Sequence, residues 1–296
     1  MKAAPAKTRA RFENILFATD FSPAADHAIP FVKRFAGHFQ SHLVAFHVRP
    51  AIVNPMTQPA TWESYIEAAK IVDQRHREEL LKTFEGLDTE VMIEEGDFQF
   101  ILDSALKKYN TDLVIIGTHG RAGVAKMLLG SVAESIFRRV ACPVLTIGPH
   151  SDPGRAHIRE ILFATSLASE DPAAAAYAVS LAQEFQARLT MLHVVPEPEP
   201  GGLVSWSDVQ ASSMQLLRKL VPDEAEAWCK PEYFVQCGDP AERILDLANL
   251  REVDLIVLGT QPERGIPGAS THLPIATAHK VVAHAKCPVL TVREQI

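Results

Sequence analysis

The chain contains the same sequence unit twice, and this repeat constrains its fold more than any other feature. Residues 15–19 read Ile-Leu-Phe-Ala-Thr and recur as the same five residues at 161–165. Residues 142–146 read Cys-Pro-Val-Leu-Thr and recur at 287–291. Self-similarity on this scale indicates two copies of one folding unit. A length of 296 residues also suits two domains of ordinary size. We therefore expect two similar domains in tandem.

Each repeat contains aliphatic runs that predict buried parallel strands. Residues 113–118 read Leu-Val-Ile-Ile-Gly-Thr, and residues 255–260 read Leu-Ile-Val-Leu-Gly-Thr. Runs without polar interruption are typical of strands that are covered on both faces, and helix-length stretches separate them. This alternation predicts an α/β fold: two tandem, doubly wound, five-stranded sheets of parallel type.

The first repeat can be divided into elements. Ser22 and Pro23 mark the start of a helix. Serine can cap the first free amide groups, and proline is well tolerated at the first helical position. Strands are predicted at about 13–19, 42–48, 89–94, 113–117 and 143–147, and helices at about 23–39, 62–85, 98–109 and 131–140.

Domain boundaries follow from the turn-forming residues between the repeats. The stretch from Gly148 to Gly154 contains two prolines and two glycines. We predict a first domain at 12–148, a linker at 149–157 and a second domain at 158–294.

Composition excludes several classes of partner. The net charge of −7 offers no basic surface for a nucleic-acid backbone. No apolar segment suits a signal peptide or a membrane span, so we expect neither nucleic acid nor membrane as a partner. The four cysteines have no Cys-x-x-Cys spacing, which argues against a zinc site or a disulfide framework. We expect Cys142 and Cys287 to be buried thiols, and the setting to be reducing and cytoplasmic.

The segment from Gly117 to Glu134 is the candidate ligand-binding loop. Glycines at 117, 120 and 123 allow backbone amides to approach a ligand closely and to form an anion nest. Ser131-x-x-Glu134 is a capping-box sequence that marks a helix start, where free amide groups favour phosphate. Open α/β sheets bind ligands at this carboxyl edge.

The spacing of these residues resembles that of a known family. Gly117-x-x-Gly120, followed after nine residues by Gly130-Ser131, is similar to the signature of the ATP-binding universal stress proteins, the UspA-like family. The flanking segments also resemble that family: Thr19 to Ser22, His47-Val48, and Cys142 to Val144. The similarity extends over nearly the whole chain as a tandem pair. It implies that each domain has a Rossmann-like fold of the adenine nucleotide alpha hydrolase type.

The resemblance implies a binding role for particular residues. Asp20 would contact the ribose or adenine, and Val48 would meet adenine through its backbone. Phosphate contacts would come from Gly120, Gly130, Ser131 and Val132, and Ala18 and Thr19 would line the base pocket. The full set of expected nucleotide-binding residues is Ala18, Thr19, Asp20, Val48, Gly117, His119, Gly120, Arg121, Gly130, Ser131 and Val132. The implied ligand is ATP with Mg. The alternative is that these glycines only shape a turn and Ser131 only caps a helix.

The second repeat departs from this pattern. Ser166 replaces Asp20, and Pro262, which has no amide hydrogen, replaces Gly120. Alignment back from Cys287 places Ile275-Ala276 where the first repeat has Gly130-Ser131. We therefore expect the phosphate site to be lost there, although Gly265 and Gly268 leave room for another ligand.

Other tempting residues have simpler interpretations. His47 and His193 end equivalent strands, but no carboxylate or second histidine is spaced to join them in a metal site, so packing is favoured. His119 is a candidate phosphate contact. Arg121 and Lys126 could neutralise phosphate charge or could be ordinary surface cations.

Three functional hypotheses follow. The first is an ATP-binding stress-response module with signalling function and at most slow hydrolysis, since no catalytic base is evident. The second is a dedicated ATP-using enzyme, which would need acidic metal ligands or a further phosphate loop that the sequence lacks. The third is a dimerising scaffold that binds no nucleotide. Family resemblance further implies a homodimer or an intramolecular pseudo-dimer formed through the last strands, residues 144–147 and 289–292.

Overall fold

The computed structural model describes residues 10–51, 59–118, 131–154, 157–167, 173–197, 205–227, 229–260 and 275–293. The chain forms two compact units. One unit consists of residues 12–117. The other consists of the residues from Thr118 onward, together with the amino-terminal residues up to Arg11. Each unit is an α/β structure with a largely parallel sheet, as the sequence predicts.

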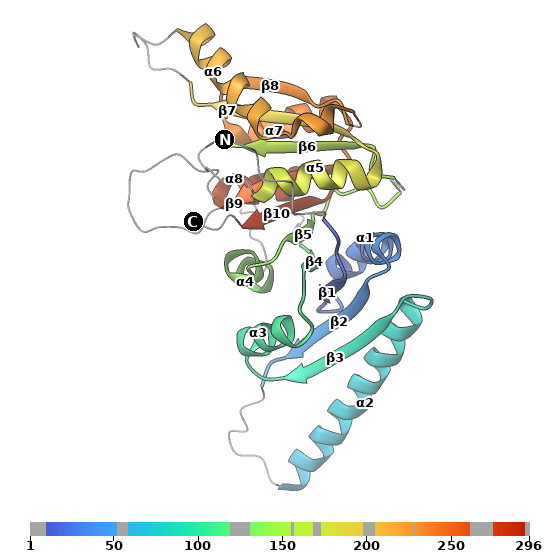
Figure 1. The fold of residues 1–296 in the computed structure, drawn as a ribbon. Coiled ribbons are helices and arrows are strands. Elements are labelled where there is room, and N and C mark those ends of the chain that lie inside the picture. Colours follow the sequence, from blue (N-terminus) through green and yellow to red (C-terminus); the bar gives the residue numbers. More distant parts are fainter. Residues whose placement is uncertain are drawn as a thin grey trace. The chain divides into compact units, whose positions relative to one another are not determined.

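The unit of residues 12–117 has four parallel strands in the order β3-β2-β1-β4 (Figure 1). The strands are β1 (Asn14–Ala18), β2 (His42–Arg49), β3 (Thr89–Glu95) and β4 (Leu113–Gly117). The helices are α1 (Pro23–Phe39), α2 (Pro59–Thr83) and α3 (Phe98–Lys108). These bounds agree closely with the predicted elements, and α1 begins at Ser22, whose side chain accepts a hydrogen bond from the amide of Ala25.

Helices cover both faces of this sheet. Phe17 in β1 packs edge-on against Phe84, directly after α2, with ring centroids 5.8 Å apart. Phe46 in β2 packs against Phe98, the first residue of α3, at 6.1 Å. Phe46 lies opposite Ala18 in the register, and adjacent strand residues point to opposite faces. Phe17 and Phe46 therefore point to opposite faces, and so α2 and α3 cover the two sides of a doubly wound sheet.

The other unit has six strands in the order β5-β10-β9-β6-β7-β8. They are β5 (Val144–Ile147), β6 (Glu160–Thr165), β7 (Arg188–Val195), β8 (Glu232–Cys237), β9 (Leu255–Thr260) and β10 (Val289–Arg293). The helices are α4 (Ser131–Arg139), α5 (Ala173–Phe185), α6 (Trp206–Lys219), α7 (Pro240–Leu250) and α8 (Ile275–His284), with a short 3-10 helix at Asp223–Ala227. One hydrophobic core joins α7 and α8 to this sheet and includes Phe137 of α4.

The last strands of the two repeats pair with each other. β10 runs antiparallel to β5, with Leu290 opposite Leu145. Because residues 142–146 and 287–291 are equivalent in the repeat, these two leucines occupy the same position in each copy. The register is therefore two-fold symmetric about the leucine pair, as in an isologous interface. This is the pairing of last strands that we expected. It also explains why β5 belongs to the compact unit that contains the second repeat.

The cysteines agree only in part with the prediction. None of the four cysteines, which all lie in the described ranges, forms a disulfide, and Cys287 is 3% exposed. Cys142 is half-buried, so its predicted full burial is wrong. It lies in the turn before β5, where the backbone has not yet entered the sheet.

An aspartate anchors the start of the first strand in each repeat. The carboxylate of Asp112 accepts hydrogen bonds from the amides of Glu13 at 2.7 Å and Asn14 at 3.2 Å. Asp254 accepts equivalent bonds from Arg159 at 2.9 Å and Glu160 at 3.1 Å. Burial raises the pKa of Asp112 to about 6, although the two amide hydrogen bonds oppose this shift.

The raised pKa of Asp112 predicts a pH-dependent stability. The folded state binds the proton more tightly than the unfolded state, so this contribution is complete below pH 3.8 and is lost as the pH rises through about 6. Asp112→Asn cannot ionise but keeps a carbonyl acceptor. Between pH 4 and 7 the free energy of unfolding of the wild type should fall by about 1–2 kcal/mol relative to that of this variant. Solvent screening of the half-buried carboxyl keeps the effect below that of a fully buried group. Urea unfolding at several pH values measures the difference, and parallel profiles would contradict the assignment.

Candidate functional site

Five of the predicted binding residues lie at the carboxyl ends of neighbouring strands in the unit of residues 12–117. Ala18 ends β1, and Thr19 and Asp20 follow it. Val48 is next to the last residue of β2, and Gly117 ends β4. Since β1 pairs in parallel with both β2 and β4, these strand ends meet at one edge of the sheet. This is the edge at which open α/β folds bind ligands.

The turn after β1 is held by its own polar groups. The amide of Thr19 donates to the carbonyl of Phe46 at 2.9 Å, and its hydroxyl accepts from the amide of Phe21 at 3.1 Å. Asp20 accepts from the amide of Ser22 at 3.0 Å. Phe21 has φ of 56°, a left-handed conformation that is uncommon for a bulky residue. Thr19 is thereby buried while Asp20 lies exposed at the strand end.

His47 holds the same turn from the neighbouring strand. Its Nδ1 lies 2.8 Å from the carbonyl oxygen of Thr19. A carbonyl can only accept, so Nδ1 carries the proton. Burial lowers the pKa of His47 below its usual value, which keeps the ring neutral at pH 7. These contacts support the packing interpretation of His47: it ties β2 to the turn.

The second repeat preserves this turn in detail. The hydroxyl of Thr165 accepts from the amide of Leu167 at 3.0 Å, and Leu167 has φ of 59°. Nδ1 of His193 lies 2.9 Å from the carbonyl oxygen of Thr165, and burial lowers the pKa of His193. The turn is therefore a property of the fold, whereas the carboxylate of Asp20, replaced by Ser166, is particular to the first repeat.

Gly117 has a structural role beside its place in the predicted loop. A Cβ atom at this position would lie 2.1 Å from the carbonyl oxygen of Ala24, in the first turn of α1. The end of β4 therefore approaches the backbone of α1 more closely than any side chain allows. The glycine is required by packing within the unit, whether or not a ligand binds nearby.

The central part of the predicted phosphate loop lies outside the described residues. This applies to His119, Gly120, Arg121, Lys126 and Gly130. Ser131 and Val132 are the first residues of α4, which belongs to the other compact unit, and Val132 is exposed.

The corresponding loop of the second repeat is also mostly outside the described range. Pro262, Gly265 and Gly268 fall there. Ile275 and Ala276 begin α8, at the position where the first repeat has Gly130-Ser131. The loss of the phosphate site in the second repeat is therefore a prediction from the sequence alone.

Sequence reasoning missed two contacts beside Val48. The guanidinium of Arg49 binds Asp73 of α2 and Glu95 of β3. The ring of Phe21 stacks on His76 of α2, with centroids 3.8 Å apart. The position of Arg49, directly after His47 and Val48, was a signal for the first contact. Its partners could not be identified, because they lie 24 or more residues away in the chain.

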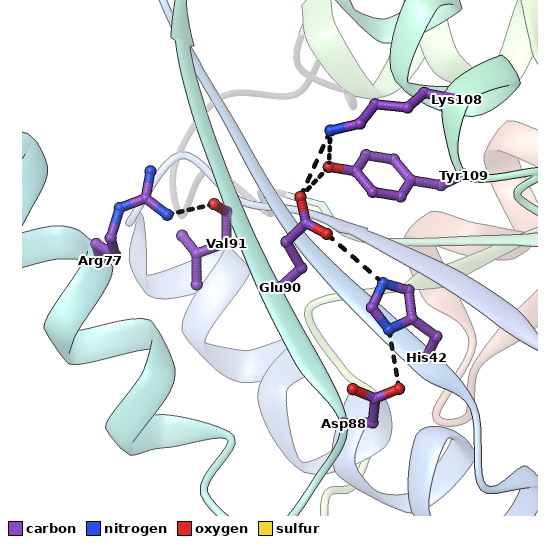
Figure 2. Close-up of polar contacts among 7 residues, drawn as sticks. All are labelled: His42, Arg77, Asp88, Glu90, Val91, Lys108 and Tyr109. Carbon is purple, nitrogen blue, oxygen red and sulfur yellow. Dashed lines mark hydrogen bonds and ion pairs between the residues drawn. The ribbon is translucent and has the colours of Figure 1, made fainter.

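A second polar cluster lies at the opposite, amino end of β2 and β3 (Figure 2). Tyr109 donates a hydrogen bond to Glu90, which lowers the pKa of that carboxyl. Lys108 lies 3.5 Å from the same carboxylate. His42 contacts Asp88 at 3.0 Å. The second repeat has Arg251 paired with Glu232 at the corresponding place. In each repeat these contacts tie the end of a helix to the strand that precedes it: α3 to β3, and α7 to β8.

Two properties of the described residues concern metal ions and membranes. No group of three or more histidine, cysteine, aspartate or glutamate side chains could hold a metal ion there. Within the same part of the chain, every helix is too short or too polar to cross a membrane.

Comparison with known proteins gives a consistent result. The model of the universal stress protein family matches twice, at residues 11–148 and 157–293. The curated universal stress protein Rv1996 of Mycobacterium tuberculosis is 25% identical over 94% of both chains. Universal stress protein MJ0531 of Methanocaldococcus jannaschii is 32% identical over 46% of this chain and 82% of its own length. Among solved structures, a universal stress protein from Archaeoglobus fulgidus covers 95% of this chain and 98% of its own, with 17% identity and a TM-score of 0.69.

Proposed function

Because the chain belongs to the universal stress protein family, with two copies of the family domain in tandem, we propose that its first repeat binds ATP. The proposed domains are residues 12–148 and 158–294, joined by a linker at 149–157. Through nucleotide occupancy the protein would act as a cytoplasmic stress-response and signalling module. Pairing of whole chains into a homodimer would add to the pairing of the repeats.

The observation that carries the proposal is the meeting of Ala18, Thr19, Asp20 and Val48 at one carboxyl edge of the sheet. The buried turn presents the exposed carboxylate of Asp20, a suitable acceptor for ribose hydroxyl groups. Val48 lies at the end of the adjacent strand, where its backbone can meet the base. The phosphate contacts are assigned from the sequence motif to Gly120, Gly130, Ser131 and Val132, and Mg would accompany the phosphates. Gly117, His119 and Arg121 complete the proposed set of nucleotide-binding residues.

Hydrolysis is expected to be slow at most. Within the described part of the site, His47 donates its Nδ1 hydrogen bond to the carbonyl oxygen of Thr19, and the carboxylate of Asp20 accepts from the amide of Ser22. Both side chains thus hold the turn after β1. Rapid turnover of ATP by pure protein would favour a dedicated enzyme instead.

Calorimetric titration of nucleotide-free protein with Mg·ATP tests the proposal. One site per chain is expected, because only the first repeat keeps both Asp20 and the glycine motif. Two sites would show that the second repeat also binds. Absence of binding would overturn the proposal and favour a scaffold function.

Gly120→Val tests the loop assignment. A branched side chain there should block the close approach of the backbone to phosphate, so we expect the Kd for Mg·ATP to rise by about tenfold or more. The thermal unfolding midpoint should stay close to that of the wild type. Unchanged affinity would remove Gly120 from the site.

A further inference from the structure

Helix α2 is attached to the proposed base-binding edge through two residues one helical turn apart. Asp73 contacts Arg49 at the end of β2, and His76 contacts Phe21 in the turn after β1. Positions three residues apart share one face of a helix. The same face of α2 thus meets the two strand ends that carry Val48 and Asp20.

The Arg49 contact is an ion cluster with a defined geometry. Nε lies 2.9 Å from Oδ1 of Asp73, and Nη2 donates to Oδ2 of the same residue at 2.9 Å. Nη1 lies 3.0 Å from Glu95. The Arg49 side chain is only 22% exposed. One hydrogen bond and two further charge contacts hold the planar guanidinium between the two carboxylates. Arg49 thereby joins α2, β2 and β3 at one point.

The charge of this cluster indicates which end of a nucleotide it serves. One guanidinium faces two carboxylates, so the cluster carries a net negative charge, and Asp20 adds another at the same edge. Like charges repel, and a triphosphate would be disfavoured here. The cluster therefore suits the base and ribose end of the ligand rather than the phosphate end.

The aromatic contact between Phe21 and His76 packs the turn after β1 directly against α2. The ring of Phe21 stacks on His76 with an interplanar angle of 18°, and it meets His47 edge-on at 4.8 Å. Phe21 is the left-handed residue between Asp20 and the start of α1. Displacement of α2 would release one face of this ring and loosen the turn that presents Asp20.

The second repeat provides an internal comparison. Strand register places Val195 and Cys237 where the first repeat has Arg49 and Glu95, since His193 is equivalent to His47. Neither residue can form this ion pair. The arginine cluster is thus found in the repeat that keeps Asp20 and the glycine motif, and is replaced in the repeat that has lost them.

We infer that Arg49 is a positioning residue for the adenine end of the nucleotide site, acting through Asp73 and the Phe21–His76 stack. This inference rests on the proposed function of the first repeat. Arg49 does not contact the ligand; it holds α2 against the turn, so that Asp20 and the end of β2 keep the spacing that an adenosine requires.

The experiment compares Mg·ATP with magnesium tripolyphosphate, which has the three phosphates but neither ribose nor base. Arg49→Met keeps the length of the stem and removes the ion cluster. The Kd for Mg·ATP should rise about tenfold, while the Kd for magnesium tripolyphosphate stays within about twofold. Arg49→Lys should recover part of the loss, because a single charge remains without the planar guanidinium. Asp73→Asn tests the same contact from α2 if Arg49→Met fails to fold.

Arg243→Met is the matched control, because Arg243 forms an exposed pair with Asp246 in α7 of the other unit. It should leave both affinities unchanged. Equal loss of ATP and tripolyphosphate binding in Arg49→Met, or no loss of either, would overturn the positioning role, while the proposal that the wild type binds ATP would stand. Failure of the wild type to bind Mg·ATP would instead overturn the proposed function, and this inference with it.

Discussion

Gly117→Ala is expected to lower the free energy of unfolding by about 3 kcal/mol or more. The added Cβ would lie 2.1 Å from the carbonyl oxygen and 2.7 Å from the carbonyl carbon of Ala24. Both are backbone atoms of α1, so no side chain can rotate away to make room. Either β4 or the first turn of α1 must shift, and each is packed on a fully buried core. Equilibrium unfolding in urea measures the loss.

Gly37→Ala is the matched control within the same unit. A Cβ at Gly37, near the end of α1, would meet only Leu87 at an ordinary distance of 3.8 Å. Alanine is the better helix former, so this variant should gain about 0.5–1 kcal/mol. If Gly117→Ala were as stable as the wild type, the close contact between β4 and α1 would be incorrect.

Leu290→Asp should destabilise the second-repeat unit by about 4 kcal/mol or more. Leu290 is fully buried and faces Leu145 at the centre of the two-fold pairing of β10 with β5. An aspartate there would bury a carboxylate among the apolar side chains at the centre of the pairing. Thermal unfolding of the full chain, followed by circular dichroism, gives the loss of stability.

Leu250→Asp controls for the change from leucine to aspartate. Leu250 ends α7 and is 80% exposed, so its replacement should alter stability by less than about 0.5 kcal/mol. Leu145→Asp, at the symmetric position, should be about as harmful as Leu290→Asp. A mild effect of both buried substitutions would show that the last strands do not pair in solution as described.

The elements of the first repeat could be predicted because their signals are local. Ser22 and Pro23 mark the start of α1, and the aliphatic run at 113–117 marks β4, independently of any distant partner. The helix α2 was placed a few residues too late, at about 62 rather than 59. Helix ends depend on weak local preferences and are the least predictable part of any element.

The candidate site could be predicted only in part. Motif spacing identified Thr19, Asp20 and Val48, and the structure brings them to one edge because parallel strands end together. The contacts of Arg49 and Phe21 with α2 were missed. They depend on which face α2 turns toward the sheet, and the helix has no strong apolar stripe from which that face could be read.

The sequence by itself determined the repeat, the order of strands and helices, the family and the loss of Asp20 and Gly120 equivalents in the second copy. Each of these features depends only on local patterns of residue type and spacing. Only the tertiary structure decided that Leu145 opposes Leu290, that Gly117 touches the backbone of α1, and that Arg49 is held by Asp73 and Glu95. Such contacts join residues far apart in the chain, and they form because folding buries both partners together, a condition that no local pattern records.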